Sequence, residues 1–444
     1  MALFGRRKKR QEEAEEPVVE VQKLPDPPAP TINGMRSMAD HRDYLLSLVE
    51  PLPPFGQNLL EAQGLALCED IVSTIELPGF DNSSMDGYAV RCADVAEAAE
   101  DNPIDLPVAG EIAAGDGDIP QLAVGTAVKI MTGAPIPDGA DAVIPYEGTN
   151  RGTDRVRIMV SATPGLHIRR RGEDIAAGTL LMNDGDQLGP RNIGLLAGVG
   201  IDKVLARPRP RVVVLSTGSE LVQPGSPLTG GGQVYDSNSY LLAAAAKAAG
   251  ALVYRVGLVS DDREEIKQTI SDQMVRADLI VSSGGVSQGD YDLVKSVMPE
   301  LGLTDFCQVA MQPGKPQGFG LIGEDDEERV PMIMVPGNPV SAFVSFEAFV
   351  RPVIRKLMGV EPYVRPTERA FTTHVIRSVK NKTQLARALV TTDPGGRRTV
   401  ELVGGHGSHL LGDLSKANAL ILLGPDVETV TAGQPIAYWP LNDG

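Results

Sequence analysis

Cysteine is scarce in this sequence. Its three cysteines, Cys68, Cys92 and Cys307, lie far apart in 444 residues and form no CxxC pair. A disulfide framework therefore has no basis in this chain, and we expect a cytoplasmic, reducing location.

Aromatic residues and positive charge are also in short supply. Aromatics make up 4% of the chain against 42% for all hydrophobic residues, so the core must be mainly aliphatic. The formal charge is 41 − 58 = −17. This balance argues against a nucleic-acid or anionic-membrane partner, because binding phosphate backbones requires clustered Lys and Arg. An anionic small ligand stays open, since it needs only a local pocket.

Long apolar runs are missing as well. No stretch approaches the roughly 18 residues that span a bilayer, and the basic N-terminus is followed by no apolar segment typical of a secretory signal. Residues 1–35 pass from "RRKKR" through acids to "LPDPPAPT" and are predicted to be a disordered tail. A helix should begin after the N-cap Ser37 and end by Pro51.

The remaining chain predicts several domains, as its length requires. Residues 52–208 are rich in turns and short strands. From residue 209, apolar strands alternate with helices, which predicts a doubly wound parallel α/β domain with β-rich domains on either side. The predicted strands are "RVVVLSTG", "LVYRVGLVS", "DLIVSSGG" and "VPMIMVPGNP".

Three loops after predicted strands carry glycine together with Ser, Asn or Asp. They are "STGSEL" (216–221), "SSGGVSQGDYD" (282–292) and "PGNPVS" (336–341). Ligands of such domains bind at the carboxyl ends of the strands, and Asn338 and Pro339 are typical of a helix N-terminus that favours anions. The sequence contains no GxxxxGK[ST] motif, so a P-loop is excluded.

Another polar loop, "GFDNSSMDGYAV" (79–90), lies in the first third of the chain. Its short side chains could simply cap a turn between strands, or they could hold a polar ligand.

Together these segments resemble the molybdenum insertases, that is, the bacterial molybdopterin molybdotransferases and the E domain of gephyrin. The matching text is "NSSMDGYAV", "KIMTGAPIPDGADAVIPYE", "RRRGEDI", "STGSEL", "SSGGVSQGDYD", "PGKP" and "PGNPVS". The resemblance extends in order from about residue 36 to the C-terminus. "MDGYA" and "TGAP" are its specific motifs, whereas "SGGVSxGD" also occurs in related adenylyltransferase domains.

The resemblance implies a reaction and an architecture. Molybdate is inserted into the dithiolene of adenylylated molybdopterin with release of AMP, in a magnesium-dependent homodimer whose clefts combine both subunits. The molybdopterin adenylyltransferase is the expected partner. The implied domains are a tail (1–35), a discontinuous domain I (36–55 and 169–208), a β-rich domain II (56–168), an α/β molybdopterin-binding domain III (209–359) and a C-terminal β domain IV (360–444).

The resemblance also implies site residues. The catalytic set is Asp86, Thr132, Asp174, Glu220, Asp261 and Asp292. The substrate-binding set is Ser83, Met85, Gly87, Thr217, Gly218, Ser283, Gly284, Gly285, Ser287, Asp290, Pro336, Gly337, Asn338 and Pro339. Molybdate is assigned to Lys315, Pro316, Ser341, Arg387 and Ser408, and Mg²⁺ to Asp292, Asp290 and Glu220.

Several of these residues also fit structural roles. Asp290 could cap the following helix, and Glu220 could be a surface acid. Asp261 is predicted to form a capping box with Glu264, and Thr132 and Asp174 could be turn formers. Arg387 is as compatible with an ordinary strand face as with an anion site. His406 and His409 are expected to hydrogen-bond rather than to bind zinc.

Two positions depart from the family pattern. Many relatives have Lys where this chain has Gln312, and a frequent serine is Lys416 here. These changes leave open a tungstate-using paralogue. Two non-catalytic functions also stay open, a gephyrin-like scaffold and a molybdopterin carrier.

Overall fold

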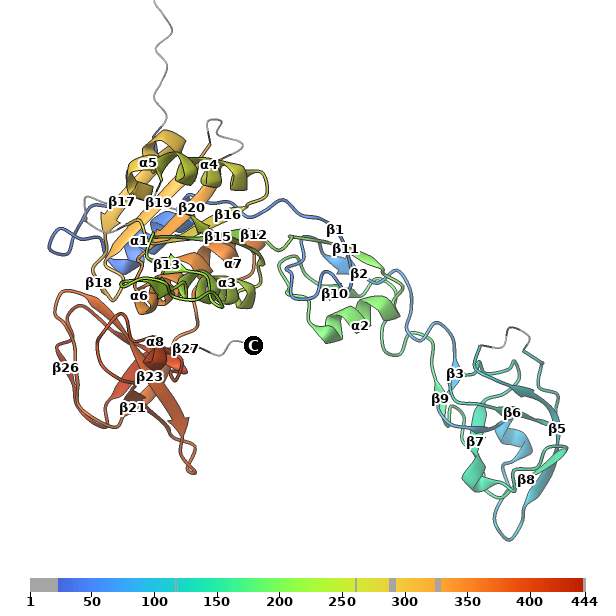
Figure 1. The fold of residues 1–444 in the computed structure, drawn as a ribbon. Coiled ribbons are helices and arrows are strands. Elements are labelled where there is room, and N and C mark those ends of the chain that lie inside the picture. The colour runs from blue at the N-terminus through green and yellow to red at the C-terminus, as the bar shows by residue number, and fades with distance from the viewer. Residues whose placement is uncertain are drawn as a thin grey trace, which may run out of the picture. The chain divides into compact units, whose positions relative to one another are not determined.

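The computed structural model describes residues 23–115, 117, 119–259, 262–286, 293–323 and 329–441. The chain divides into two compact units, Met1–Leu52 with Arg209–Gly444, and Pro53–Pro208 (Figure 1). The first part of the predicted tail lies outside the described residues. Residues 23–35 make contacts that the tail prediction did not include, since the Pro25 carbonyl accepts a hydrogen bond from the Tyr44 hydroxyl at 2.9 Å.

A six-stranded sheet forms the centre of the first unit. Its order is β15-β12-β16-β20-β19-β17, and the four strands from β15 to β20 run parallel. β19 runs antiparallel to both of its neighbours, β20 and β17, so the sheet is mixed rather than wholly parallel as the sequence predicts. The strands are β12 (Arg211–Thr217), β15 (Leu252–Val259), β16 (Leu279–Ser283), β17 (Gly302–Gln308), β19 (Pro316–Ile322) and β20 (Val330–Val335).

Helices cover both faces of this sheet (Figure 1). They are α1 (Met38–Ser47), α3 (Asn238–Ala248), α4 (Arg263–Met274), α5 (Leu293–Leu301), α6 (Pro339–Ser345), the π-helix η3 (Phe346–Val350) and α7 (Arg351–Met358). Figure 1 places α4 and α5 on one face, with α1, α3, α6 and α7 on the other. The doubly wound α/β domain is thereby confirmed.

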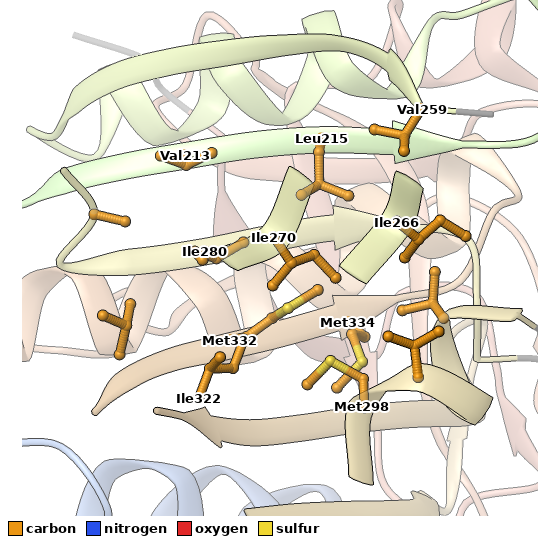
Figure 2. Packing of buried hydrophobic residues seen from close by; sticks show 14 of the residues in the cluster. Val213, Leu215, Val259, Ile266, Ile270, Ile280, Met298, Ile322, Met332 and Met334 are labelled. Carbon is orange, nitrogen blue, oxygen red and sulfur yellow. The ribbon is translucent and has the colours of Figure 1, made fainter. Parts of the chain in front are cut away.

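Alternate residues of the strands build the core beneath α4 and α5. Val213 and Leu215 of β12 point to this face with Met332 and Met334 of β20, because side chains two apart share one side of a strand (Figure 2). Ile266 from α4 packs against them. Burial of this aliphatic cluster holds the strands in the register that aligns their carboxyl ends.

The start of α1 agrees with the sequence, and that of α4 does not. The Ser37 hydroxyl caps α1 by accepting from Asp40 N–H at 3.0 Å. The predicted capping box at Asp261 is wrong: the N-cap of α4 is Asp262, whose carboxylate accepts from the N–H groups of Glu264 and Glu265. From the position next to the helix its carboxylate reaches both donors of the first turn. Asp261 itself lies outside the described residues.

The C-terminal part of this unit is a β-barrel. Strands β23, β24, β21, β27 and β25 pair in that order, and β25 pairs again with β23 to close the barrel. The short β18, from the α/β part, adds to β23 in parallel. The bounds are β18 (Met311–Gln312), β21 (Glu368–Thr372), β22 (Ile376–Arg377), β23 (Thr383–Thr392), β24 (Arg398–Leu402), α8 (Leu411–Leu414), β25 (Ala419–Leu423), β26 (Thr429–Val430) and β27 (Pro435–Pro440).

The second unit is rich in β-structure. A five-stranded sheet has the order β7-β4-β6-β5-β8, and small two-stranded pairs join β1 to β11, β2 to β10 and β3 to β9. A short helix, α2, also lies here, although the sequence reading of this range is strand-like. The bounds are β1 (Phe55–Asn58), β2 (Ile71–Val72), β3 (Asn82–Ser83), β4 (Gly87–Val90), η1 (Cys92–Asp94), β5 (Ile104–Ile112), β6 (Ala127–Ile130), β7 (Ala142–Pro145), η2 (Tyr146–Gly148), β8 (Arg155–Ile158), β9 (Ile168–Arg169), β10 (Leu180–Met182), α2 (Pro190–Gly198) and β11 (Lys203–Ala206).

Within the described part of the chain, none of the helices combines the length and the apolar character needed to cross a membrane.

Candidate functional site

The described parts of the three predicted ligand loops (216–221, 282–286 and 336–341) meet at one edge of the six-stranded sheet. In the parallel register Ser216 lies beside Ser283, and Ser283 beside Val335, so β12, β16 and β20 end at the same level. The loops that follow these strands lie next to each other and line two adjoining cavities.

The first cavity, here called the Glu220 cleft, encloses about 540 Å³. It lies over the ends of β12, β16 and β20 and includes the start of α3. The short strands β13 (Leu221–Val222) and β14 (Val234–Tyr235) form one wall. Its lining residues are Ser216, Thr217, Glu220, Leu221, Val234, Tyr235, Asp236, Ser237, Asn238, Ser283, Gly284, Gly337, Asn338, Pro339 and His409.

The second cavity, here called the Lys315 cleft, encloses about 480 Å³. It shares Gly284, Gly337 and Asn338 with the Glu220 cleft, so the two form a continuous depression. Its lining residues are Gly284, Gly285, Val286, Gln312, Pro313, Gly314, Lys315, Pro316, Pro336, Gly337, Asn338, Ser341, His406 and Ser408. Four of the five residues assigned to molybdate therefore line one cavity.

Two acids line the Glu220 cleft with different surroundings. Asp236 is 1% exposed, and its carboxylate accepts hydrogen bonds from the Ser239 N–H, at 3.0 Å, and from the Ser239 hydroxyl. Glu220 is exposed, and its carboxylate folds back over Gly218, where an added Cβ would lie 2.6 Å from a carboxylate oxygen. Of the two, Glu220 is the acid that a ligand can reach.

The loop that carries Lys315 is anchored from below. The buried Gln317 amide donates to the Gly314 carbonyl at 2.6 Å and to the Ser345 hydroxyl at 2.7 Å. Gly314 has a φ of 97°, which favours glycine. Lys315 is exposed, and among the described residues it forms no ion pair. The loop therefore presents an available cation to the cleft.

The barrel contributes the opposite wall of the Lys315 cleft. The Ser408 carbonyl accepts from Val340 N–H at 3.0 Å, which joins the barrel loop 404–409 to α6. Ser341, 5% exposed, lies in the first turn of α6. Ser408 and Ser341 thus bring two hydroxyl groups to the cavity that holds Lys315.

Arg387 lies in β23 behind this wall rather than in the Lys315 cleft. It is 5% exposed, and its guanidinium donates to the Gly405 and Gly407 carbonyls. Burial lowers the pKa of Arg387, while the nearby Asp413 carboxylate raises it. With Gln312, Gln384 and His406 it lines a small adjoining cavity of about 30 Å³. Arg387 therefore shapes the loop that carries Ser408.

The polar loop in the second unit forms a local hydrogen-bond cluster. The Thr132 N–H and hydroxyl both donate to Asp86, at 2.7 and 2.8 Å, and lower the pKa of that carboxyl. Ser83 is fully buried, and its hydroxyl donates to the Met85 carbonyl at 2.5 Å. Gly87 is required sterically, because an added Cβ would lie 2.0 Å from the Ile144 carbonyl oxygen.

These contacts explain much of the loop's composition. Asn82 and Ser83 bond local backbone, as the turn interpretation predicts. Asp81 and Asp86 instead accept from the distant Arg171 and Thr132, and Asp86 and Met85 remain exposed. Asp174 is also exposed, and its N–H donates to the Leu77 carbonyl at 3.1 Å.

Four predicted site residues fall outside the described residues: Asp261, Ser287, Asp290 and Asp292. Of the three acids assigned to Mg²⁺, the described residues therefore contain Glu220. Its exposed carboxylate lines the Glu220 cleft together with Thr217, and carboxylate oxygens are the ligands that Mg²⁺ prefers.

One other set of potential metal ligands occurs among the described residues, away from the clefts. His41, Asp305 and Cys307 place their ligand atoms within 4.8 Å of one another. However, both carboxylate oxygens of Asp305 are bonded by Arg36. Burial raises the pKa of the Cys307 thiol to about 12. A guanidinium cation and a protonated thiol oppose metal binding, so the group is a buried ion pair.

Several cleft residues were not predicted from the sequence. Tyr235, Asp236, Asn238, His406 and His409 all line the clefts. Asn238 belongs to "DSNSYLL", which is typical of a helix start, and no local pattern separates a cap from a cleft residue. The two histidines were considered as hydrogen-bonding groups, and His406 Nδ1 lies 3.3 Å from Gln384 Nε2.

Family models match most of the chain. Residues 36–200 match the MoeA N-terminal region (domain I and II), residues 213–356 a probable molybdopterin binding domain, and residues 369–441 the MoeA C-terminal region (domain IV). The second match contains the three loops and Lys315.

Individual relatives agree with these matches. Molybdopterin molybdenumtransferase 2 of Mycobacterium tuberculosis (strain CDC 1551 / Oshkosh) is 44% identical over 92% of this chain and 100% of its own length. The molybdopterin molybdenumtransferase of Haemophilus influenzae is 37% identical over 87% of this chain and 93% of its own. A solved molybdopterin biosynthesis moea protein from Pyrococcus horikosii has a TM-score of 0.74 and 32% identity, covering 92% of this chain and 99% of that one.

Proposed function

Because this chain belongs to the MoeA family of molybdopterin molybdenumtransferases, we propose that it inserts molybdenum into molybdopterin at the carboxyl edge of its six-stranded sheet. The observation that carries this assignment is the continuous depression formed by the Glu220 and Lys315 clefts. Most of its lining residues lie in the range matched as a molybdopterin-binding domain, and the C-terminal barrel adds His406, Ser408 and His409. A gephyrin-like scaffold and a simple carrier are not favoured by these comparisons.

Within this reaction we assign molybdate to the Lys315 cleft. A small dianion needs a cation and hydrogen-bond donors, and this cavity offers the Lys315 ammonium with the Ser341 and Ser408 hydroxyls. The neutral Gln312 lines the same cavity. We expect these four side chains to determine whether the protein prefers molybdate or tungstate.

We assign the phosphate-bearing part of the substrate to the Glu220 cleft. There the backbone of Gly284 and Gly337 can approach a phosphate closely, because neither residue has a side chain. We take the substrate to be adenylylated molybdopterin, whose hydrolysis at the phosphoanhydride releases AMP. When bound, Mg²⁺ neutralises phosphate charge, and Glu220 is the described residue suited to hold it.

The cellular arrangement is also a proposal. The family resemblance supports a homodimer and a partnership with the molybdopterin adenylyltransferase. Free thiols at Cys68, Cys92 and Cys307 agree with a cytoplasmic location.

An AMP-release assay tests the assignment of the Lys315 cleft. The full chain is mixed with adenylylated molybdopterin and Mg²⁺, and AMP is measured as a function of molybdate. Lys315→Ala should raise the molybdate concentration for half-maximal release at least tenfold, because it removes the cation of the cavity. Lys247→Ala, which removes an exposed lysine of α3 outside the two clefts, is the matched control and should leave the molybdate requirement unchanged. An unchanged molybdate requirement in Lys315→Ala would contradict the assignment.

A further inference from the structure

Asn238 ties two of the ligand loops together. It is the first residue of α3, is 9% exposed and lines the Glu220 cleft. Its Nδ2 donates to the Ser283 hydroxyl at 2.7 Å and to the Gly337 carbonyl at 2.6 Å. Ser283 ends β16, and Gly337 follows β20. One amide group therefore connects the ends of two neighbouring strands at the rim of the site.

The geometry fixes which way the amide faces. A backbone carbonyl can only accept, so the atom 2.6 Å from the Gly337 oxygen must be the amide nitrogen. Both hydrogens of Nδ2 are then used by Gly337 and Ser283. The Asn238 Oδ1 is left buried with no partner among the described residues, and so is the hydroxyl of Ser216, another residue that lines this cleft.

This arrangement differs from helix capping. A capping side chain uses its oxygen to accept an N–H of the first turn, whereas the Asn238 oxygen accepts none from the described residues. A buried acceptor without a partner costs stability. The side chain therefore serves the two loops, while the Asp236 carboxylate accepts from the Ser239 N–H in the first turn of α3.

The two loops touch at their glycines. An added Cβ on Gly337 would lie 3.8 Å from the Gly284 Cα, and Gly284 N–H donates to the Val335 carbonyl at 3.0 Å. Glycine backbone has wide conformational freedom, so the spacing of the loops depends on cross-links from neighbouring elements. Asn238 provides such a link from α3.

We propose that Asn238 is a positioning residue for molybdopterin binding. It holds the Gly284 and Gly337 loops at the separation where their backbone meets the phosphate-bearing part of the ligand. The proposal rests on the function assigned above to the Glu220 cleft. It adds a residue that acts through the two loops and that does not belong to the predicted site.

Asn238→Asp tests this with almost no change in shape. The carboxylate cannot donate, so the hydrogen bond to the Gly337 carbonyl is lost and an oxygen faces that carbonyl in place of the amide nitrogen. The Ser283 hydroxyl can turn to donate to the carboxylate, so the link to Gly337 is the one removed. Asn238→Ala, which removes the donor without adding a charge, should weaken binding as well and so separates lost positioning from charge repulsion of the phosphate. The dissociation constant for molybdopterin, measured by titration of the full chain, should rise at least tenfold. The melting temperature is measured in parallel to separate a loss of binding from a loss of folding.

Asn192→Asp is the matched control. Asn192 lies in the first turn of α2, in the other unit, where its Oδ1 accepts from Gly189 N–H at 2.9 Å. Aspartate can keep that bond, so binding should stay unchanged. Ser283→Ala, Asn238→Ala and the double variant together form a double-mutant cycle. Both single changes remove the same hydrogen bond. The double variant should therefore lose less affinity than the product of the two single fold-losses.

The outcomes separate this inference from the proposed function. If wild type binds molybdopterin and a folded Asn238→Asp binds it within twofold of wild type, the positioning role is wrong while the proposed function stands. If wild type does not bind molybdopterin, the proposed function fails first and the inference fails with it. Should Asn238→Asp not fold, Asn238→Ala carries the test. A threefold or greater loss of affinity supports the role, and unchanged affinity overturns it.

Discussion

The attachment of the C-terminal barrel should depend on one buried ion pair. Glu347, in η3, is 2% exposed at its side chain, and Arg365, in the connection to the barrel, is 10% exposed. The guanidinium donates to both carboxylate oxygens, at 2.5 and 3.0 Å, and also to the Pro440 carbonyl of β27 at 3.0 Å. Because the barrel supplies Ser408 to the Lys315 cleft, this contact bears on the site as well as on stability.

Glu347→Gln removes the negative charge of this pair, so the buried Arg365 guanidinium loses the Glu347 carboxylate. Breaking a buried pair in this way costs about 3–5 kcal/mol. With a urea dependence of about 2 kcal/mol per molar, typical of small domains, a 3 kcal/mol loss lowers the urea midpoint by about 1.5 M. The sequence contains one tryptophan, Trp439, which lies in β27 and is 2% exposed. Its fluorescence therefore reports directly on unfolding of the barrel.

The control is the same substitution at an exposed pair of the barrel. Lys380 and Glu428 are 2.8 Å apart, with side chains 67% and 61% exposed. Glu428→Gln should leave the midpoint of the tryptophan transition unchanged, because exposed ion pairs contribute little. If Glu347→Gln unfolds at the same urea concentration as Glu428→Gln and wild type, the buried pair does not hold the barrel, and the reasoning fails.

Two further predictions concern the α/β domain. Gln317→Leu leaves the Gly314 carbonyl and the Ser345 hydroxyl without their donor, so it should cost about 1–3 kcal/mol in thermal unfolding. It should also weaken molybdate binding at Lys315 in a titration; unchanged stability and affinity would contradict this. Burial lowers the pKa of His41 to about 4 from its usual 6.5. As the pH falls, His41 is therefore protonated in the unfolded chain before it is protonated in the folded protein. Stability should be full above pH 6.5 and fall by up to about 3 kcal/mol as the pH drops towards 4, and His41→Gln should flatten this part of the profile.

The alternation of strands and helices could be predicted from local pattern, whereas the antiparallel strand β19 could not. In β19, Gly318 and Gly320 weaken the strand pattern. The structure shows why glycine is there: an added Cβ on Gly318 would lie 2.8 Å from the Phe306 ring, and one on Gly320 would lie 2.6 Å from the Met298 methyl group. Glycine is needed at these two positions because of tertiary contacts, and such contacts cannot be read from the neighbouring residues in the sequence.

The candidate site shows the same division. Strand-end loops such as the one holding Gly284 could be located because parallel strands end together. Asn238 could not be recognised, since its partners Ser283 and Gly337 lie far along the chain. For Arg387 the sequence fitted an ordinary strand face as well as an anion site. Its burial behind the barrel loop depends on the pairing of β23 with β25, which closes the barrel.

The central claim is that this chain places molybdenum on molybdopterin. The most direct measurement is the molybdenum content of the released pterin after one turnover, determined by mass spectrometry with wild type, adenylylated molybdopterin, Mg²⁺ and molybdate. Close to one molybdenum per AMP released is the expected result. AMP release without molybdenum in the product, or a pterin that stays bound and unchanged, would contradict the function.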